Sequence, residues 1–137
     1  MKKLTLLLGT IAFVLTIGFQ SCGGGAIGNS PGATVKKSIN LMAEKNYEKV
    51  VAMYTKKDGS ALTEEEKGKM LGLMTMANAE LTKKQGVKTL EIIEEKISED
   101  GKTASVKWKI TYGNGETDNN NGDLVKVGSD WKMIIGN

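Results

Sequence analysis

Residues 103–112 read Thr-Ala-Ser-Val-Lys-Trp-Lys-Ile-Thr-Tyr, and polar and apolar side chains alternate along this stretch without a break. Successive side chains of a β-strand point to opposite faces of a sheet, so the alternation predicts a strand with one buried face. The residues predicted to be buried are Ala104, Val106, Trp108, Ile110 and Tyr112. Such a face must be covered, so the strand requires neighbouring strands and a second layer.

Turn sequences on both sides of this strand predict three more strands. The turns each contain glycine and lie at 99–101, 113–115 and 128–130. The strands that they separate are expected at 87–97, 103–112, 116–127 and 131–135. Hairpins join strands that follow one another, so the prediction is a four-stranded antiparallel meander, with a β-bulge near Ile92 and Ile93.

The chain before residue 87 has apolar residues at helical spacing. We expect helices over 34–45 and 46–55, or one bent helix, after a Ser30-Pro31 start. Thr63 and Glu66 form a capping-box pattern that opens a helix over 63–84. Its predicted buried face consists of Met70, Leu73, Met74, Ala77 and Leu81. The predicted fold class is therefore α+β, with amino-terminal helices packed on a curved antiparallel sheet.

The amino terminus has the pattern of an exported lipoprotein. Two lysines precede an uncharged apolar stretch over 4–19, which predicts a secretory signal peptide at 1–21. Ser21-Cys22 resembles the cleavage site of a lipobox, with Cys22 as the lipidated residue. Residues 22–32 are then a lipidated cysteine and a flexible tether, and residues 33–137 form a single α+β domain. We expect attachment to the cell envelope, with the periplasmic face of a Gram-negative outer membrane favoured.

Composition excludes several classes of function. The chain has no histidine and no arginine, so it lacks the usual general base at neutral pH and the side chain that binds phosphates in bidentate fashion. Without the predicted signal, 17 of the 19 lysines remain against 16 acidic residues, a nearly neutral balance. We expect no nucleic-acid binding, no cofactor and no metal site. The single cysteine excludes an intramolecular disulfide.

Helices followed by a sheet that closes with Gly-Ser-Asp-Trp-Lys resemble the nuclear transport factor two-like, or cystatin-like, superfamily. The residues that carry the resemblance are the Ser30-Pro31 start, 45–50 (Lys-Asn-Tyr-Glu-Lys-Val) and 131–134 (Trp-Lys-Met-Ile). More narrowly, residues 30–137 resemble its lipoprotein branch, made of domains of unknown function. The resemblance implies a cone-shaped fold with a pocket between helices and sheet, and no assigned chemistry.

Two clusters of side chains have the composition of metal sites, but a structural role is the better interpretation of both. Met70, Met74 and Met76 could bind reduced copper, but Met74 and Met76 lie roughly 200° apart on a helix, so core packing is the better interpretation. Residues 118–123 are rich in oxygen ligands, but their spacing does not fit a calcium-binding helix–loop–helix. A polar strand, or a bulged edge that resists aggregation, is expected there instead. Acidic residues at 94–95 are predicted to face Lys107 and Lys109 as cross-strand pairs.

Catalysis is not expected. Enzymes of the wider superfamily use an aspartate, or a histidine–aspartate pair, together with a tyrosine, and no acid falls at an inward position of the strand at 103–112. The residues predicted to line a pocket are Tyr47, Tyr54, Met74, Trp108, Tyr112 and Trp131. The expected function is a membrane-tethered, non-catalytic module that binds a small apolar ligand or an envelope protein. The alternatives are an enzyme with a carboxylate and a tyrosine in the pocket, and a structural subunit of an envelope complex.

Overall fold

The computed structural model describes residues 29–136, in which helices come first and most of the sheet follows. In chain order the elements are α1 (Pro31–Ala43), α2 (Tyr47–Val51), β1 (Tyr54–Thr55), α3 (Glu64–Lys83), β2 (Val87–Ile97), β3 (Thr103–Tyr112), β4 (Thr117–Val127) and β5 (Asp130–Ile134). The predicted α+β class is confirmed. The predicted strands at 87–97, 103–112, 116–127 and 131–135 all form, within one residue at each end.

The sheet has five strands in the order β1-β5-β4-β3-β2, and it is mixed. Strands β2 to β5 form the predicted antiparallel meander, but β1 pairs with β5 in parallel through Tyr54–Met133 and Thr55–Ile134. The prediction of four antiparallel strands is therefore wrong in strand number and in one pairing. The predicted bulge is confirmed, because the β2–β3 register shifts between Ile92 and Glu94.

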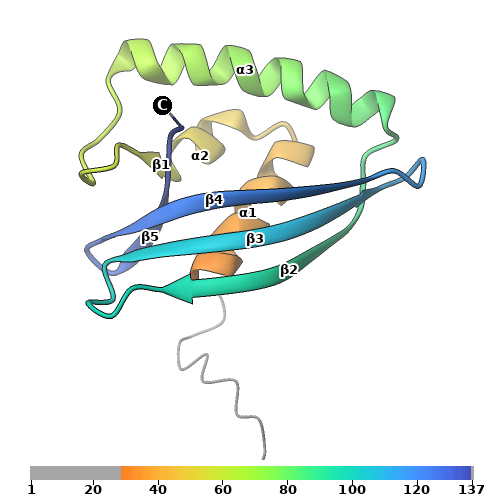
Figure 1. Ribbon diagram of the computed structural model, residues 1–137. Coiled ribbons are helices and arrows are strands. Elements are labelled where there is room, and N and C mark those ends of the chain that lie inside the picture. The colour runs from red at the N-terminus through yellow and green to blue at the C-terminus, as the bar shows by residue number, and fades with distance from the viewer. Residues whose placement is uncertain (1–28, 137) are drawn as a thin grey trace, which may run out of the picture.

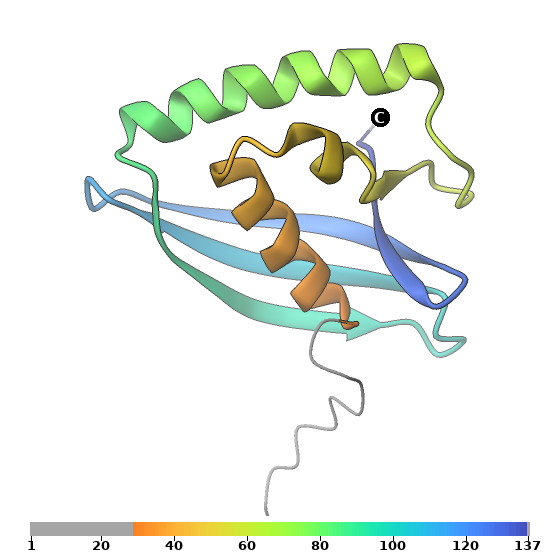
Figure 2. The same cartoon turned by 180° about the vertical axis from the view of Figure 1, so that it is seen from behind.

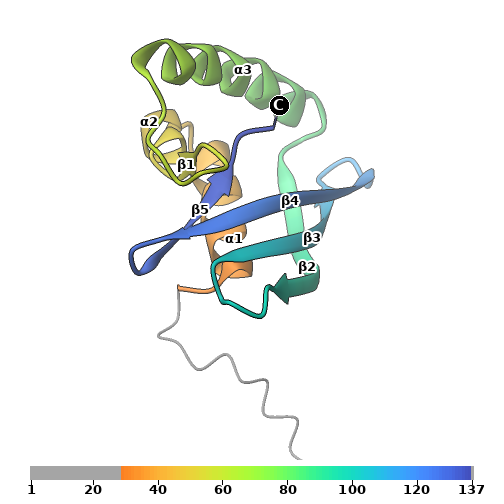
Figure 3. The ribbon, with the colours of Figure 1, turned by 60° about the vertical axis from the view of Figure 1, so that its left-hand side comes forward.

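The helices cover one face and one end of the sheet. Helix α1 crosses behind the sheet in Figure 1 and lies in front of it when the molecule is turned round in Figure 2. Helix α3 runs across the top, above α2 and the end of α1, and the side view in Figure 3 shows it displaced from the plane of the strands. The opposite face of the sheet carries no cover from the described elements.

Helix α1 begins at Pro31, which confirms the predicted Ser30-Pro31 start, although the helical range itself was expected only from 34. Ser30 caps it, since its hydroxyl oxygen accepts a hydrogen bond from the Ala33 amide at 3.1 Å. The Gly32 amide donates to Glu95 Oε2 on β2 at 2.9 Å, which anchors this first turn to the sheet. Pro31 and Gly32 are buried, so the folded part starts inside the segment predicted to be a tether at 22–32.

The segment predicted as a helix over 46–55 divides into α2 and β1. The helix ends at Val51, and Met53 and Thr55 then use their carbonyl oxygens as acceptors for the amides of Met133 and Ile135, at 2.8 and 3.1 Å. The spacing of Tyr47, Val50, Val51 and Tyr54 matches a helix, but a two-residue strand is too short to produce a period of its own. The fifth strand of the sheet, β1, therefore comes from a segment that was predicted to be helical.

Helix α3 confirms the predicted start but not the whole predicted buried face. Thr63 and Glu66 form the capping box, with the Thr63 amide donating to Glu66 at 2.7 Å and the Glu66 amide donating to Thr63 at 3.2 Å. Leu73, predicted to be buried, is 66% exposed, whereas Asn78 is buried. The buried face is thus rotated relative to the prediction, because the Asn78 side chain donates to the Met42 carbonyl oxygen at the end of α1, at 3.0 Å.

Two groups of buried residues stabilise the domain. The sheet core lies between α1 and the strands and consists of Val35, Ala104, Val106, Trp108, Ile110, Tyr112, Leu124, Trp131 and Met133. The helical core lies under α3 and consists of Val50, Val51, Leu62 and Met74. All five residues predicted to be buried on the strand at 103–112 belong to the sheet core, which confirms that prediction. No helix within residues 29–136 combines the length and the apolar character needed to cross a bilayer.

Candidate functional site

A groove lies where α1, α3 and the sheet meet, with a volume of about 390 Å³. This is near the lower end of the volumes usual for small-molecule sites, which are roughly 300–1,000 Å³. We name it the helix–sheet groove, and its lining residues are Ile39, Met42, Ala77, Glu80, Leu81, Lys84, Ile110, Tyr112 and Asp118. Most of the walls are apolar, and the charged residues come from the ends of α3 and β4.

The strand pairing brings Asp118 to the groove. Asp118 pairs with Ile110 in the β3–β4 register, so it lies on the same face of the sheet as the buried side of β3. Leu124, farther along β4, lies on that face too and is fully buried. The apolar face of the sheet therefore ends in a carboxylate beside α3.

Asp118 is at the centre of a polar cluster at one end of the groove. Its Oδ2 atom accepts a hydrogen bond from the Tyr112 hydroxyl at 2.7 Å and another from Lys84 Nζ at 2.9 Å. Lys84 Nζ also lies 3.5 Å from a carboxylate oxygen of Glu116 and 4.4 Å from the centre of the Tyr112 ring. One lysine thus links α3 to two strands through two carboxylates and a cation–π contact.

Backbone hydrogen bonds hold Lys84 in this position. Helix α3 ends there, and the Gly86 amide donates back to the Leu81 carbonyl at 2.7 Å, with φ of 63° at Gln85 and 75° at Gly86. The turn after β3 then donates to the same end of α3, from Gly113 to Gly86 at 3.0 Å and from Asn114 to Lys84 at 3.1 Å. The helix end and the hairpin are therefore fixed to each other directly beside the cluster.

Electrostatics stabilise the charged form of Asp118 and of Lys84. The hydrogen bond from Lys84, and then that from Tyr112, lowers the pKa of Asp118. The hydrogen bond to Asp118 is the main cause that raises the pKa of Lys84. Burial, followed by the hydrogen bond to Asp118, raises the pKa of Tyr112, so its phenol stays a donor. At neutral pH the cluster contains a carboxylate, an ammonium group and a neutral phenol.

The six residues predicted to line a pocket are distributed over the domain. Tyr112 lies in the helix–sheet groove, whereas Tyr54 and Trp131 line two separate, smaller hollows. Tyr47 packs against the helical core and Met74 is part of it. Trp108 is in the sheet core, and its indole N–H makes no hydrogen bond within the described part of the chain. The structure does not bring these six side chains together in one place.

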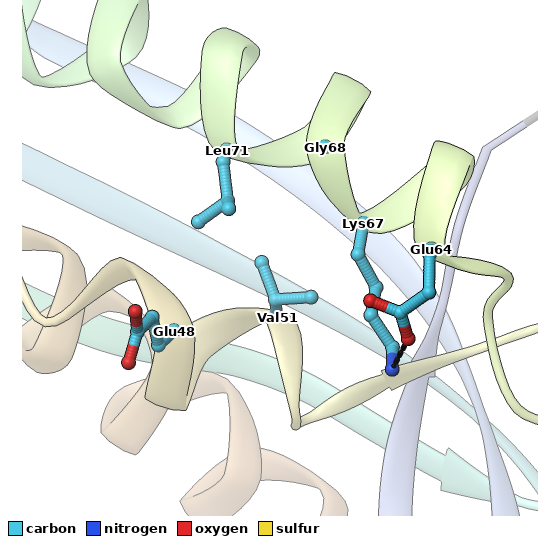
Figure 4. Close-up of a pocket in the computed structure, with 6 residues that line it drawn as sticks. All are labelled: Glu48, Val51, Glu64, Lys67, Gly68 and Leu71. Carbon is cyan, nitrogen blue, oxygen red and sulfur yellow. Dashed lines mark hydrogen bonds and ion pairs between the residues drawn. The ribbon is translucent and has the colours of Figure 1, made fainter.

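Two other hollows have fewer apolar side chains. One of about 290 Å³ lies between α2 and α3, where Figure 4 shows Val51 and Leu71 approaching each other beside the 2.6 Å ion pair of Glu64 and Lys67. The other, of about 440 Å³, lies near the β2–β3 turn, and six of its ten lining residues are polar or charged. The helix–sheet groove combines an apolar wall with a defined polar cluster, and it is the strongest candidate for a binding site.

Within residues 29–136, no group of three or more acidic or cysteine side chains is arranged to hold a metal ion. Asp118 to Asp123, considered above for calcium, lie in β4, and the predicted polar strand is confirmed. Met74 is buried while Met76 is 68% exposed, so the two thioethers do not face a common site. The predicted lipidation and cleavage residues, Ser21 and Cys22, lie outside the described residues.

Sequence reasoning did not identify most of the groove. From the sequence, Leu81 is only an apolar position of the helix predicted over 63–84, and Lys84 is only its last residue. The sequence predicts Asp118 only as part of a polar strand, because its inward position depends on which β3 residue it pairs with. A count from the Gly113–Gly115 turn would have placed Thr111 opposite Thr117 and so Ile110 opposite Asp118.

The sequence matches a domain of unknown function, DUF4878, over residues 20–134. A comparison with curated proteins finds no match. The structure is similar to the crystal structure of a Campylobacter jejuni protein named as a candidate NTF2-like transpeptidase, with 18% identity and a TM-score of 0.66 over 77% of this chain and 98% of that one. It is also similar to the solution structure of a SEC-C motif containing protein from Rhodopseudomonas palustris, with 17% identity and a TM-score of 0.51 over 79% and 77% of the two chains. At these identities the likeness concerns the fold alone, which is of the NTF2-like type.

Proposed function

The chain belongs to the DUF4878 family of domains of unknown function, and on that premise we propose that it is a membrane-tethered binding module of the cell envelope that holds a small apolar ligand. The helix–sheet groove is the binding site in this proposal. The observation that carries it is an apolar wall formed by Ile39, Met42, Leu81 and Ile110, with a hydrogen-bonded cluster at one end. Apolar walls with a few placed polar groups are typical of small-molecule sites.

A lipid anchor at Cys22 is part of the proposal. The family match starts at residue 20 and so includes Ser21 and Cys22. Helix α1 begins at the end of the domain that lies opposite α3 (Figures 1 and 2). An anchor attached before Ser30 leaves the groove end of the domain free to meet a ligand. Several acyl chains on one cysteine, at about 0.8 kcal/mol for each buried methylene, would make the attachment durable.

Catalysis is the alternative that a specific observation favours, because Tyr112 and Asp118 are a tyrosine and a carboxylate in one groove. Asp118 is, however, hydrogen-bonded twice at Oδ2, and these bonds lower its pKa. A general base works best with a pKa near the working pH, and a general acid needs a raised one. The lowered pKa of Asp118 therefore supports binding over acid–base chemistry. The word transpeptidase in the name of the C. jejuni neighbour refers to that protein alone.

Titration with 1-octanol, an uncharged apolar probe, tests the groove. The full chain is held in amphipol, and amide chemical shifts of Leu81 and Ile110 are followed by NMR. We expect saturable shifts in the wild type. Ala77 lines the groove from an exposed helical position, so the indole of Ala77→Trp is expected to occupy the space that the probe would take. We expect binding to weaken by roughly tenfold or more, because the probe then loses its apolar contact with the groove wall.

Ala79→Trp is the matched control. Ala79 is exposed on the same helix and lies roughly 200° around it from Ala77, so the same side chain is added away from the groove. We expect the control to bind octanol as the wild type does. Absence of saturable shifts in the wild type, or equal weakening by both variants, would reject the groove as an apolar ligand site.

A further inference from the structure

We propose, resting on the function proposed above, that the ligand is an amphiphile whose positively charged, hydrogen-bond-donating head group binds the free oxygen of Asp118. Its apolar tail then lies along the groove. The chemical class is that of a primary alkylammonium compound. Three observations favour this class over an anionic or a purely apolar ligand.

Most donors of the polar cluster already face carboxylates of the protein. The Tyr112 hydroxyl has one hydrogen, and it is donated to Asp118 Oδ2. Lys84 Nζ donates to the same oxygen and lies beside Glu116 as well. A carboxylate or phosphate head group would find at most the remaining N–H of Lys84, and it would lie beside the two carboxylates that Lys84 already contacts.

The acceptors are not all used. Asp118 Oδ1 makes no hydrogen bond to any residue in 29–136, although Asp118 lines the groove. Glu80 lines the groove too, and only its Oε1 atom is paired, with Lys83 at 2.6 Å. A carboxylate has two oxygens that accept hydrogen bonds, so both residues keep capacity for an incoming donor.

The net charge at this end of the groove also favours a cationic head group. The carboxylates of Asp118 and Glu116 lie 2.9 and 3.5 Å from the ammonium group of Lys84, and Glu80, which lines the same groove, pairs with Lys83. The cluster therefore carries one more negative than positive charge. A cationic head group reduces this excess, whereas an anionic one increases it.

The apolar residues are placed to receive the tail of the same molecule. Ile39 and Met42 come from α1, Leu81 from α3 and Ile110 from β3, and all four line the groove that ends at Asp118. Ile39, Met42 and Leu81 remain partly exposed, so the wall offers apolar surface that a tail would remove from water. Head and tail sites are thus parts of one groove.

Three probes with one tail length and different head groups test the proposal in the NMR assay at neutral pH. They are octylammonium, octanoate and 1-octanol. We expect octylammonium to bind roughly tenfold more tightly than octanoate, the effect of one charge-assisted hydrogen bond. Asp118→Asn is expected to reduce this ratio to about twofold, because the negative charge that favours the ammonium head group is removed.

Asp123→Asn is the matched control, since Asp123 is exposed on the same strand and pairs with Ser105. If Asp118→Asn unfolds the domain, Glu80→Gln replaces it as the test variant, with an expected smaller reduction of the same ratio. Octanol binding without a preference for octylammonium would overturn the head-group assignment and leave the proposed function intact. Absence of binding by all three probes would reject the proposed function itself.

Discussion

The sheet core and the helical core are packed very differently. The sheet core joins nine buried residues from α1 and three strands, and Val35, Val106 and Leu124 in it are fully buried. The helical core has four buried residues, and α3, with twenty residues, contributes only Met74 to it, while Leu73 and Met76 are mostly exposed. The helix–sheet groove lies between a tightly packed region and a lightly attached helix. Ligand-binding sites are commonly formed by weakly packed elements such as α3, where local stability is low.

The largest expected effect compares the two cores by truncation. Leu124→Ala removes a fully buried side chain from the sheet core and is expected to lower the free energy of unfolding by about 4 kcal/mol. Met74→Ala in the helical core is expected to lower it by about 2 kcal/mol, because this core has only four buried residues and its surroundings can relax into the space. Urea unfolding of the two variants measures both values.

Leu73→Ala is the control for the orientation of α3. Leu73 precedes Met74 in the sequence but is 66% exposed, so its truncation is expected to change stability by less than about 0.5 kcal/mol. A loss for Leu73→Ala as large as for Met74→Ala would mean that α3 presents the face first expected from its sequence. A loss for Met74→Ala that equals that of Leu124→Ala would remove the contrast between the two cores.

A smaller effect is expected on the outer face of the sheet, where Glu94 pairs with Lys107 at 2.7 Å and Lys96 at 2.9 Å. The hydrogen bond from Lys107, then that from Lys96, lowers the pKa of Glu94 from 4.5 to about 2. A lowered folded-state pKa stabilises the fold above the unfolded value, and this contribution is lost as the pH falls from 4.5 toward 2.

Glu94→Gln is therefore expected to be less stable than the wild type at pH 6, and the difference is expected to shrink as the pH approaches 2. Urea unfolding across this range measures it. Glu91→Gln is the matched control, since Glu91 pairs with Lys109 in the register but forms no ion pair within residues 29–136. A difference for Glu94→Gln that does not change with pH would contradict the role of the pair.

Local patterns predicted the parts of the fold that local rules determine. The alternation at 103–112, the turns and the capping box at Thr63 each depend on neighbours in sequence, and all three were confirmed. The face of α3 could not be predicted in this way. Asn78 is polar and yet buried, because it meets the Met42 carbonyl oxygen at the end of another helix. The pattern of apolar residues along the sequence cannot predict that contact.

The candidate site depended on pairing between distant segments, and sequence reasoning found only one member of its polar cluster. Tyr112 was predicted to line a pocket, because it falls in the apolar phase of its strand. Asp118 needed the β3–β4 register, and Lys84 needed the contact between the end of α3 and the β3–β4 turn. The pairing of β1 with β5 also joins distant segments, and it could not be predicted because a strand of two residues shows no alternation of polar and apolar side chains.

Native mass spectrometry of the full chain, released from membranes with detergent, tests the proposed ligand and the proposed anchor in one spectrum. We expect the wild type to carry a covalent acyl mass that Cys22→Ser lacks, and a non-covalent small-molecule mass that Ala77→Trp loses and Ala79→Trp keeps. A wild-type chain with neither added mass would contradict a lipid-anchored module that holds an apolar ligand in the helix–sheet groove.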